Sequence, residues 1–166
     1  AQRGTSGRDV IDVGTTVEET LRLAEADARA FGMTIQLDCE SDLPPVIADP
    51  VQIQQVVLNL LRNALESLEE ANNRTQPIRI EVRGKAPDDI AVRVTDYGVG
   101  IRDEDRAHLF EPFHTTKDAG MGIGLAISRT IITAHGGELS FKPNPEGGAV
   151  FEFTLPTTIG VESNER

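Results

Sequence analysis

The sequence predicts an α+β fold, a two-layer sandwich in which one mixed, mostly antiparallel sheet packs on helices. The first observation behind this prediction is that segments with helical periodicity and segments with strand periodicity are interspersed along the chain. The second is that the last two strand candidates are separated only by a short turn of asparagine, proline and glycine, which is typical of an antiparallel hairpin. Together they favour a sandwich over a doubly wound parallel sheet.

About five main strands and three helices are expected from the periodicity of the apolar residues. The strand candidates, two short pieces included, are residues 10–13, 33–39, 46–48, 78–83, 90–95, 138–142 and 149–155. The helix candidates carry apolar residues at spacings of three and four. One enters through residues 15–18 and ends near residue 31, and the others span residues 51–71 and 122–134.

Two of these helices carry recognisable end signals. A threonine-rich stretch at residues 15–18 is the expected N-cap region of the first helix, and Gly32 is its expected stop. Asp49 followed by Pro50 is a strong start signal for the second helix. Aspartate accepts hydrogen bonds from the free N–H groups of a first turn, and proline suits the first helical position.

Length and composition restrict the classes of function. The chain has 166 residues, 39% of them hydrophobic and 26% charged, which suits one globular domain. A net charge of −11, no tryptophan and one tyrosine argue against binding to nucleic acid or to an anionic membrane surface. A single cysteine, Cys39, excludes an internal disulfide and fits a reducing compartment. With no signal peptide or membrane-spanning run recognisable, the expected location is cytoplasmic, although the parent protein could be membrane-anchored.

The polar ends of the chain suggest the domain boundaries. Residues 1–9 are expected to form a linker or the end of an upstream element, residues 10–156 the domain, and residues 157–166 a loose tail. Between residues 98 and 124 no period is sustained, apart from a possible helical turn at residues 103–109. Irregular stretches of this length inside a compact domain are usually functional.

The chain is organised around a loop that follows the strand candidate at residues 90–95. Asp96 leads into Gly98, Gly100 and Ile101, so one carboxylate stands before two closely spaced glycines. Glycine can adopt positive φ and lets a flat ligand lie against bare backbone. A carboxylate there can accept a hydrogen bond from an amino group such as that of adenine. The motif alone is also a common turn.

A polar stripe runs along the long helix candidate. Asn59, Arg62, Asn63 and Glu66 are three and four residues apart and therefore share one face. Such a stripe often faces solvent. The functional alternative is that an asparagine carboxamide oxygen binds Mg²⁺, a hard cation that prefers oxygen ligands and is often held together with substrate phosphates.

A second glycine-rich segment opens the last helix candidate. Glycines at a helix N-terminus leave backbone N–H groups free to meet a phosphate, and Lys117 just before them is a suitable cation. A dinucleotide-binding fingerprint is excluded because no strand immediately precedes the segment. Its residues are Gly120, Met121, Gly122, Ile123, Gly124 and Leu125.

Two phenylalanines lie inside the irregular stretch. Phe110 and Phe113 are expected to anchor it, either as simple loop packing or as anchors of a movable lid. His108, His114 and His135 lack the spacing of metal ligands, and we expect them to be structural or exposed.

In their order along the chain, these blocks resemble the catalytic ATP-binding (HATPase) domain of sensor histidine kinases, in the GHKL superfamily shared with gyrase, Hsp90 and MutL. Residues 55–64 resemble the N box, residues 96–101 the first glycine box, residues 110–113 the F box and residues 120–125 the second glycine box. The resemblance runs from about residue 10 to Pro156. The sequences of residues 61–66 and 113–117 are most similar to those of the nitrogen-regulation and FixL-like kinases.

The resemblance implies the Bergerat ATP-binding fold, with an irregular ATP lid over about residues 102–121 and with ATP and Mg²⁺ as ligands. Asp96 would bind the adenine amino group. Gly98, Gly100 and Ile101 would shape the base pocket.

On the phosphate side, the resemblance implies that Asn63 is the main Mg²⁺ ligand, with Asn59 beside it near the phosphates. The chain departs from the commonest N box at Glu66, where many kinases have a lysine. This departure shifts the expected phosphate contacts to Arg62 and Lys117. Further lid contacts would come from Gly120, Met121, Gly122, Gly124 and Leu125.

Kinases of this family transfer the γ-phosphoryl group of ATP to a histidine on a separate helical dimerisation domain. No histidine of this chain has the sequence context of such an acceptor. The implied partners are therefore the dimerisation and histidine phosphotransfer domain of the same protein and, downstream, the receiver domain of a response regulator. No general base is assigned within the chain.

Two other functions remain open at the level of sequence. A serine kinase of the anti-sigma type would use the same nucleotide site on a similar length of chain. A degenerate, non-enzymatic nucleotide-binding scaffold is the other, although Asn63, Asp96 and the glycines are intact. ATPases of the gyrase type carry a glutamate four residues before the metal-binding asparagine. That position here is Asn59, which argues against efficient hydrolysis.

Overall fold

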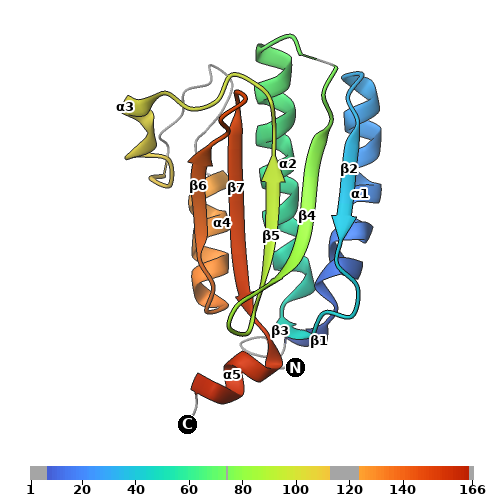
Figure 1. The fold of residues 1–166 in the computed structure, drawn as a ribbon, viewed down its shortest axis with the longest axis vertical. Coiled ribbons are helices and arrows are strands. Elements are labelled where there is room, and N and C mark those ends of the chain that lie inside the picture. Colours follow the sequence, from blue (N-terminus) through green and yellow to red (C-terminus); the bar gives the residue numbers. More distant parts are fainter. Residues whose placement is uncertain (1–6, 74, 113–123, 165–166) are drawn as a thin grey trace.

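Five strands form the larger sheet of the computed structural model, which describes residues 7–73, 75–112 and 124–164. In spatial order they are β2 (Ile35–Cys39), β4 (Ile78–Lys85), β5 (Asp89–Thr95), β7 (Ala149–Pro156) and β6 (Leu139–Pro143). β2 and β4 are parallel, and all other neighbouring strands of this sheet are antiparallel (Figure 1).

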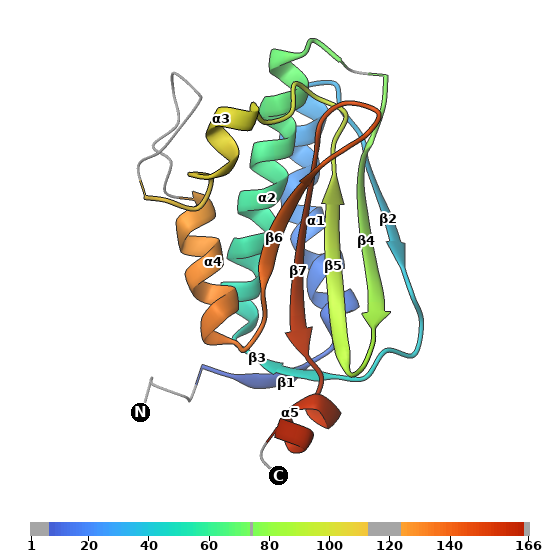
Figure 2. The same cartoon turned by 60° about the vertical axis from the view of Figure 1, so that its left-hand side comes forward.

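Three helices cover one face of this sheet and leave the other face open (Figures 1 and 2). They are α1 (Val13–Ala30), α2 (Pro50–Glu70) and α4 (Gly124–Ala134). The expected two-layer α+β sandwich, with its mixed sheet of five main strands on three helices, is therefore confirmed. The start of α4 was expected at Gly122, which lies outside the described residues.

The core lies between the sheet and the helices, and strand alternation decides which side chains enter it. In β4, Ile78, Ile80 and Val82 are fully buried, whereas Arg79 between them is exposed. Phe153 of β7 is the largest fully buried side chain. The helices contribute apolar residues at spacings of three and four. On α2 these are Ile53, Val56, Val57, Leu60, Leu61, Ala64, Leu65 and Leu68.

The start of α1 differs from the expectation. The strand predicted at residues 10–13 is β1 (Asp9–Ile11), and Asp12 caps the helix by accepting a hydrogen bond from Thr15 N–H at 2.9 Å. The predicted threonine-rich cap lies inside the first turns. Val13 explains the earlier start, because it is 1% exposed and enters the core as the first residue of the helix. The caps expected at Asp49 and Pro50 are confirmed.

The C-terminal residues also differ from the expected loose tail. Helix α5 (Thr158–Asn164) follows β7 directly. Thr157 is 2% exposed, and both its N–H and its hydroxyl donate to Asp88 O, at 2.9 and 2.8 Å. Thr158 N–H donates to Pro45 O at 3.0 Å. These bonds reach residues distant in sequence, so polar composition alone could not reveal them.

The remaining elements are short. β1 pairs in antiparallel fashion with β3 (Val46–Ala48) at the end of the sandwich where β7 finishes (Figure 1). Within the irregular stretch, α3 (Asp103–Arg106) confirms the helical turn expected near residues 103–109. In the described part of the chain, no helix combines the length and the apolar composition needed to cross a bilayer.

Candidate functional site

Asp96 stands at the end of β5 and is the best-buried carboxylate of the loop, with 3% of its surface exposed. Its Oδ1 atom accepts hydrogen bonds from Gly98 N–H at 2.9 Å, Ser67 Oγ at 3.3 Å and Ala149 N–H at 3.3 Å. Its own backbone N–H donates to Ala149 O at 3.0 Å. A buried carboxylate needs such donors to offset desolvation, and they also hold it in one orientation.

The glycine after this carboxylate is required by close packing. A Cβ atom on Gly98 would lie 2.2 Å from Ser67 Oγ and 2.5 Å from the Ser67 carbonyl carbon. The loop therefore presses its bare backbone against α2, while Gly100 takes the expected positive φ of 72°. Close packing against α2 and against Gly148 of the β6–β7 turn thus holds the loop beside the buried Asp96 carboxylate.

The first residue of the polar stripe on α2, Asn59, does not face solvent. Asn59 is half-buried, and its Nδ2 atom donates to Gly124 O at 3.3 Å and to Ser128 Oγ at 3.2 Å. These contacts tie α2 to the first turns of α4. Asn63, one turn further along α2, is also half-buried, and Arg62 is exposed. Half-buried carboxamides supply the hard oxygen donors that suit Mg²⁺.

Three further predicted site residues are described by the structure, and they are Ile101, Gly124 and Leu125. Ile101 and Leu125 are partly buried and pack against the core. A Cβ atom on Gly124 would lie 3.7 Å from the Asn59 side chain, so the backbone of α4 runs close to the stripe. Five predicted residues lie outside the described part of the chain, and they are Phe113, Lys117, Gly120, Met121 and Gly122.

The described start of the irregular stretch is fixed by charged contacts. Arg129 of α4 lies over the Phe110 ring at 5.4 Å, which supports Phe110 as an anchor. Arg106 lies over the ring of Phe141 in β6 at 5.8 Å. Arg102 Nε donates to Asp105 Oδ2 at 3.0 Å, and this hydrogen bond raises the pKa of Arg102 above its ordinary value.

Three residues of the site were missed in the sequence. Ser67 continues the spacing of four from Asn59 and Asn63, and this periodicity could have revealed it. Asn144, in the β6–β7 turn, donates from Nδ2 to Asp96 O at 3.0 Å. A Cβ atom on Gly148 would lie 2.2 Å from the same Asp96 oxygen. Asn144 and Gly148 are distant from Asp96 in sequence, so no local sequence pattern predicts these two contacts.

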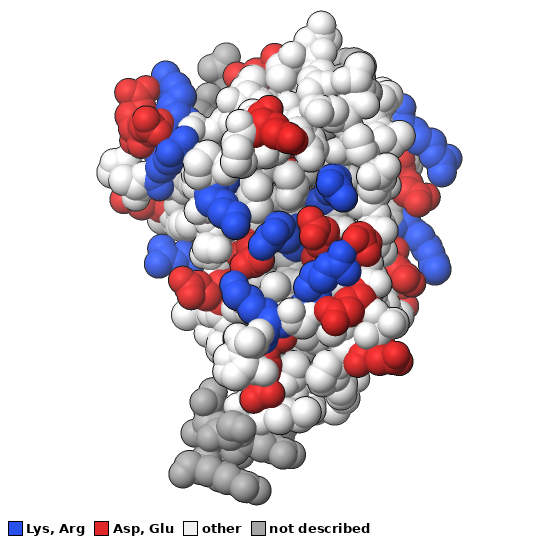
Figure 3. Space-filling model, in the orientation of Figure 1, with Lys and Arg blue, Asp and Glu red and all other residues white. Residues whose placement is uncertain are grey.

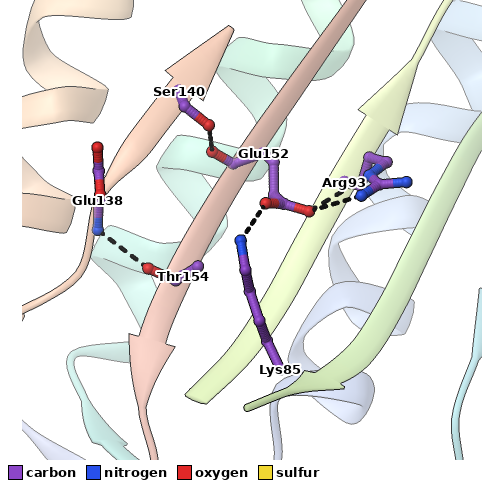
Figure 4. Close-up of polar contacts among 6 residues, drawn as sticks. All are labelled: Lys85, Arg93, Glu138, Ser140, Glu152 and Thr154. Carbon is purple, nitrogen blue, oxygen red and sulfur yellow. Dashed lines mark hydrogen bonds and ion pairs between the residues drawn. The ribbon is translucent and has the colours of Figure 1, made fainter. Parts of the chain in front are cut away.

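The open face of the sheet carries a different group of charges (Figure 3). Glu152 of β7 is paired with Lys85 at 2.8 Å and with Arg93 at 3.1 Å (Figure 4). Burial raises the pKa of the Glu152 carboxyl, but the hydrogen bonds from the two cations prevail and hold this pKa below its ordinary value of 4.5. The cluster borders a pocket of about 290 Å³ lined by Glu81, Arg83, Gly84, Lys85, Ala91, Arg93 and Glu152. Since Glu152 is already paired with two cations, we regard this cluster as structural.

The described residues contain no group of three or more His, Cys, Asp or Glu side chains that could hold a metal ion. Magnesium bound with nucleotide phosphates does not need such a group, because one or two protein oxygens, phosphates and waters complete its shell.

Comparison with known proteins shows the family of this chain. Residues 48–159 match the family described as histidine kinase-, DNA gyrase B-, and HSP90-like ATPase. The match covers more than half of the chain and includes both α2 and the Asp96 loop. The chain belongs to this family.

Named relatives of this ATPase family are sensor kinases. Sensor protein FixL of Bradyrhizobium diazoefficiens is 43% identical over 154 residues, which cover 93% of this chain and 30% of that protein. Sporulation kinase E of Bacillus subtilis is 34% identical over 88% of this chain and 19% of that protein. The chain therefore spans about a third or less of the length of these relatives.

Solved structures match over nearly the whole domain. The catalytic domain of histidine kinase ThkA superposes with a TM-score of 0.78 at 30% identity, covering 90% of this chain and 95% of that domain. Full-length ShkA in complex with AMPPNP superposes with a TM-score of 0.77 at 25% identity, covering 90% of this chain and 31% of ShkA. The described fold is thus that of a histidine kinase catalytic domain of this ATPase family.

Proposed function

We propose that this chain is the catalytic domain of a two-component sensor histidine kinase, which binds Mg-ATP and donates the γ-phosphoryl group to a histidine on a separate dimerisation domain. The observation that carries the proposal is the buried Asp96 carboxylate, held by three donors beside a glycine loop. It sits at the position that the family resemblance assigns to adenine recognition.

The adenine amino group would donate to Asp96, and the loop with Gly98, Gly100 and Ile101 would lie along the base. A carboxylate accepts from the 6-amino group of adenine but repels the 6-oxo group of guanine, which is itself an acceptor. Because three protein donors fix the carboxylate before binding, little further ordering is needed when the base arrives.

On the phosphate side, Asn63 would hold Mg²⁺, with Asn59 beside it and Arg62 as a nearby cation. Bound Mg²⁺ would supply neutralisation of the phosphate charge. The proposed contacts from the second glycine box and Lys117 would hold the phosphates in line with an acceptor, since phosphoryl transfer relies on positioning and charge stabilisation. No residue of this chain is assigned as a general base.

The larger assembly follows from the same proposal. The domain would comprise residues 10–156, extended to Asp9 by β1 and to Asn164 by α5, and the residues before β1 would connect it to the dimerisation and phosphotransfer domain. A response regulator receiver domain would accept the phosphoryl group afterwards, and the site of action would be cytoplasmic. The similarity to a protein named as a sensor protein and to the catalytic domain of a histidine kinase favours histidine over serine as the acceptor.

The test is titration with a non-hydrolysable ATP analogue by calorimetry, with Mg²⁺ and with chelator. Asp96→Asn replaces the charged acceptor and is expected to cost about 2 kcal/mol, or about 30-fold in Kd. Asp27→Asn, on the exposed side of α1, removes the same charge elsewhere and is the matched control. Phosphotransfer to an added dimerisation domain follows. A folded wild-type chain that binds no nucleotide under any of these conditions contradicts the proposal.

A further inference from the structure

Ser67 lies at the contact between helix α2, which carries the proposed phosphate-side residues, and the loop that begins with Asp96. It follows Asn59 and Asn63 at spacings of four residues, so the three side chains form one stripe on α2. The stripe spans about 12 Å along the helix axis, at about 1.5 Å per residue. Asn59, at one end, contacts the start of α4, and Ser67, at the other end, contacts the Asp96 loop.

Ser67 is buried and contacts the Asp96 loop through several atoms. It is 8% exposed, and its hydroxyl donates to Asp96 Oδ1 at 3.3 Å. Its carbonyl oxygen accepts from Val99 N–H at 3.4 Å, and its atoms fill the space that a Cβ on Gly98 would need. Ser67 therefore touches the loop through both its main chain and its side chain.

Two of the donors described for Asp96 Oδ1 are backbone groups, from Gly98 and Ala149. Their positions follow from the loop and from β7. The Ser67 hydroxyl is the side-chain donor among the three, and it comes from the helix that carries the proposed phosphate-side residues. A substitution at Ser67 can therefore change the orientation of the carboxylate while the backbone donors stay in place.

We propose that Ser67 is a positioning residue that sets the preference of this site for 6-aminopurine nucleotides, through its hydrogen bond to Asp96. This inference rests on the proposed nucleotide-binding function and deepens it. The hydroxyl holds the carboxylate in the direction from which it accepts the amino hydrogen of the base. Without the hydroxyl the carboxylate keeps its backbone donors from Gly98 and Ala149, so nucleotide binding persists and selectivity for the amino group falls.

The experiment compares two nucleotides on each protein: AMPPNP, and the matching purine riboside analogue that lacks the 6-amino group. Dissociation constants are measured by calorimetry with Mg²⁺ for the wild type, Ser67→Ala and Ser128→Ala. Ser128 is the matched control, because it is a buried serine of α4 that contacts Asn59, at the opposite end of the stripe from Ser67. Alanine is a good helix former, and thermal unfolding shows whether each variant is folded.

Ser67→Ala is expected to weaken AMPPNP binding by about 3- to 10-fold and to change binding of the analogue by less than about 2-fold. Ser128→Ala is expected to affect both nucleotides equally. Equal losses for both nucleotides in Ser67→Ala, or no loss for either, overturn the inference while leaving nucleotide binding intact. A wild type that binds neither nucleotide overturns the proposed function itself, and the inference with it.

Discussion

Substitution of Gly148 by alanine should damage both the fold and the Asp96 loop, and its neighbour provides the control. Gly147 and Gly148 adopt nearly the same backbone φ, 97° and 102°, which side-chain-bearing residues rarely take. A Cβ atom on Gly147 would meet nothing within 4 Å, whereas a Cβ on Gly148 would lie 2.2 Å from Asp96 O. The pair therefore separates backbone strain from the close approach to Asp96.

The expected magnitudes follow from these distances. Gly147→Ala should lower the free energy of unfolding by about 1 to 2 kcal/mol, which is the cost of positive φ in a residue other than glycine. Gly148→Ala adds overpacking against a backbone oxygen, typically about 1 to 3 kcal/mol more. The total for Gly148→Ala is then about 2 to 5 kcal/mol.

Urea denaturation, followed by circular dichroism, measures both variants under identical conditions. Calorimetry with AMPPNP on the folded fraction then shows whether the Asp96 loop has moved. We expect Gly148→Ala to lose affinity and Gly147→Ala to keep it. Equal unfolding free energies for the two variants, with equal affinities, would refute the close approach of the β6–β7 turn to Asp96.

Two further predictions concern stability. Glu152→Gln should lower the free energy of unfolding near neutral pH by less than about 1 kcal/mol, because the charge pairs lie on an accessible sheet face. Since the folded-state pKa of Glu152 is below 4.5, its contribution to the free energy of unfolding is complete above that pH and is lost as the pH falls through the lowered pKa. The difference in unfolding free energy between wild type and Glu152→Gln must therefore disappear in acid. A difference that stays constant with pH would contradict this. His135→Phe should cost about 2 kcal/mol in urea denaturation, because the 5% exposed imidazole accepts from Asp49 N–H at 3.1 Å and contacts Ile131 O at 2.7 Å. An unchanged midpoint in His135→Phe would show that these bonds do not support the junction of α2 and α4.

The sequence was informative wherever one segment carried a complete signal. Asp49 and Pro50 correctly predicted the start of α2, because helix capping depends on residues within one turn. The start of α1 was placed too late because several capping residues stand close together there. The choice of Asp12 depends on Val13 entering the core, which is a tertiary effect.

In the candidate site too, local motifs were predictable from the sequence and tertiary contacts were not. Asp96 and Asn63 were each predicted from a motif whose residues lie within a few positions of one another. The residues around Asp96 were harder to find, because Asn144 and Gly148 reach it from about 50 positions away. Helix α5 was missed for a similar reason, since it is held by carbonyl groups of Asp88 and Pro45.

The position of β3 has a consequence for how such a domain can be built into larger proteins. β1 pairs with β3, and Thr157 forms a bridge to Val46, so the first and last described elements meet beside this strand (Figure 2). In the β5–β7 register, Pro156 lies opposite Asp89, at the other end of β5 from Asp96. Sequence joined before β1 or after α5 thus enters at the end of the domain remote from the Asp96 carboxylate. Both connections therefore lie at one end of β5, and the proposed nucleotide site lies at the other.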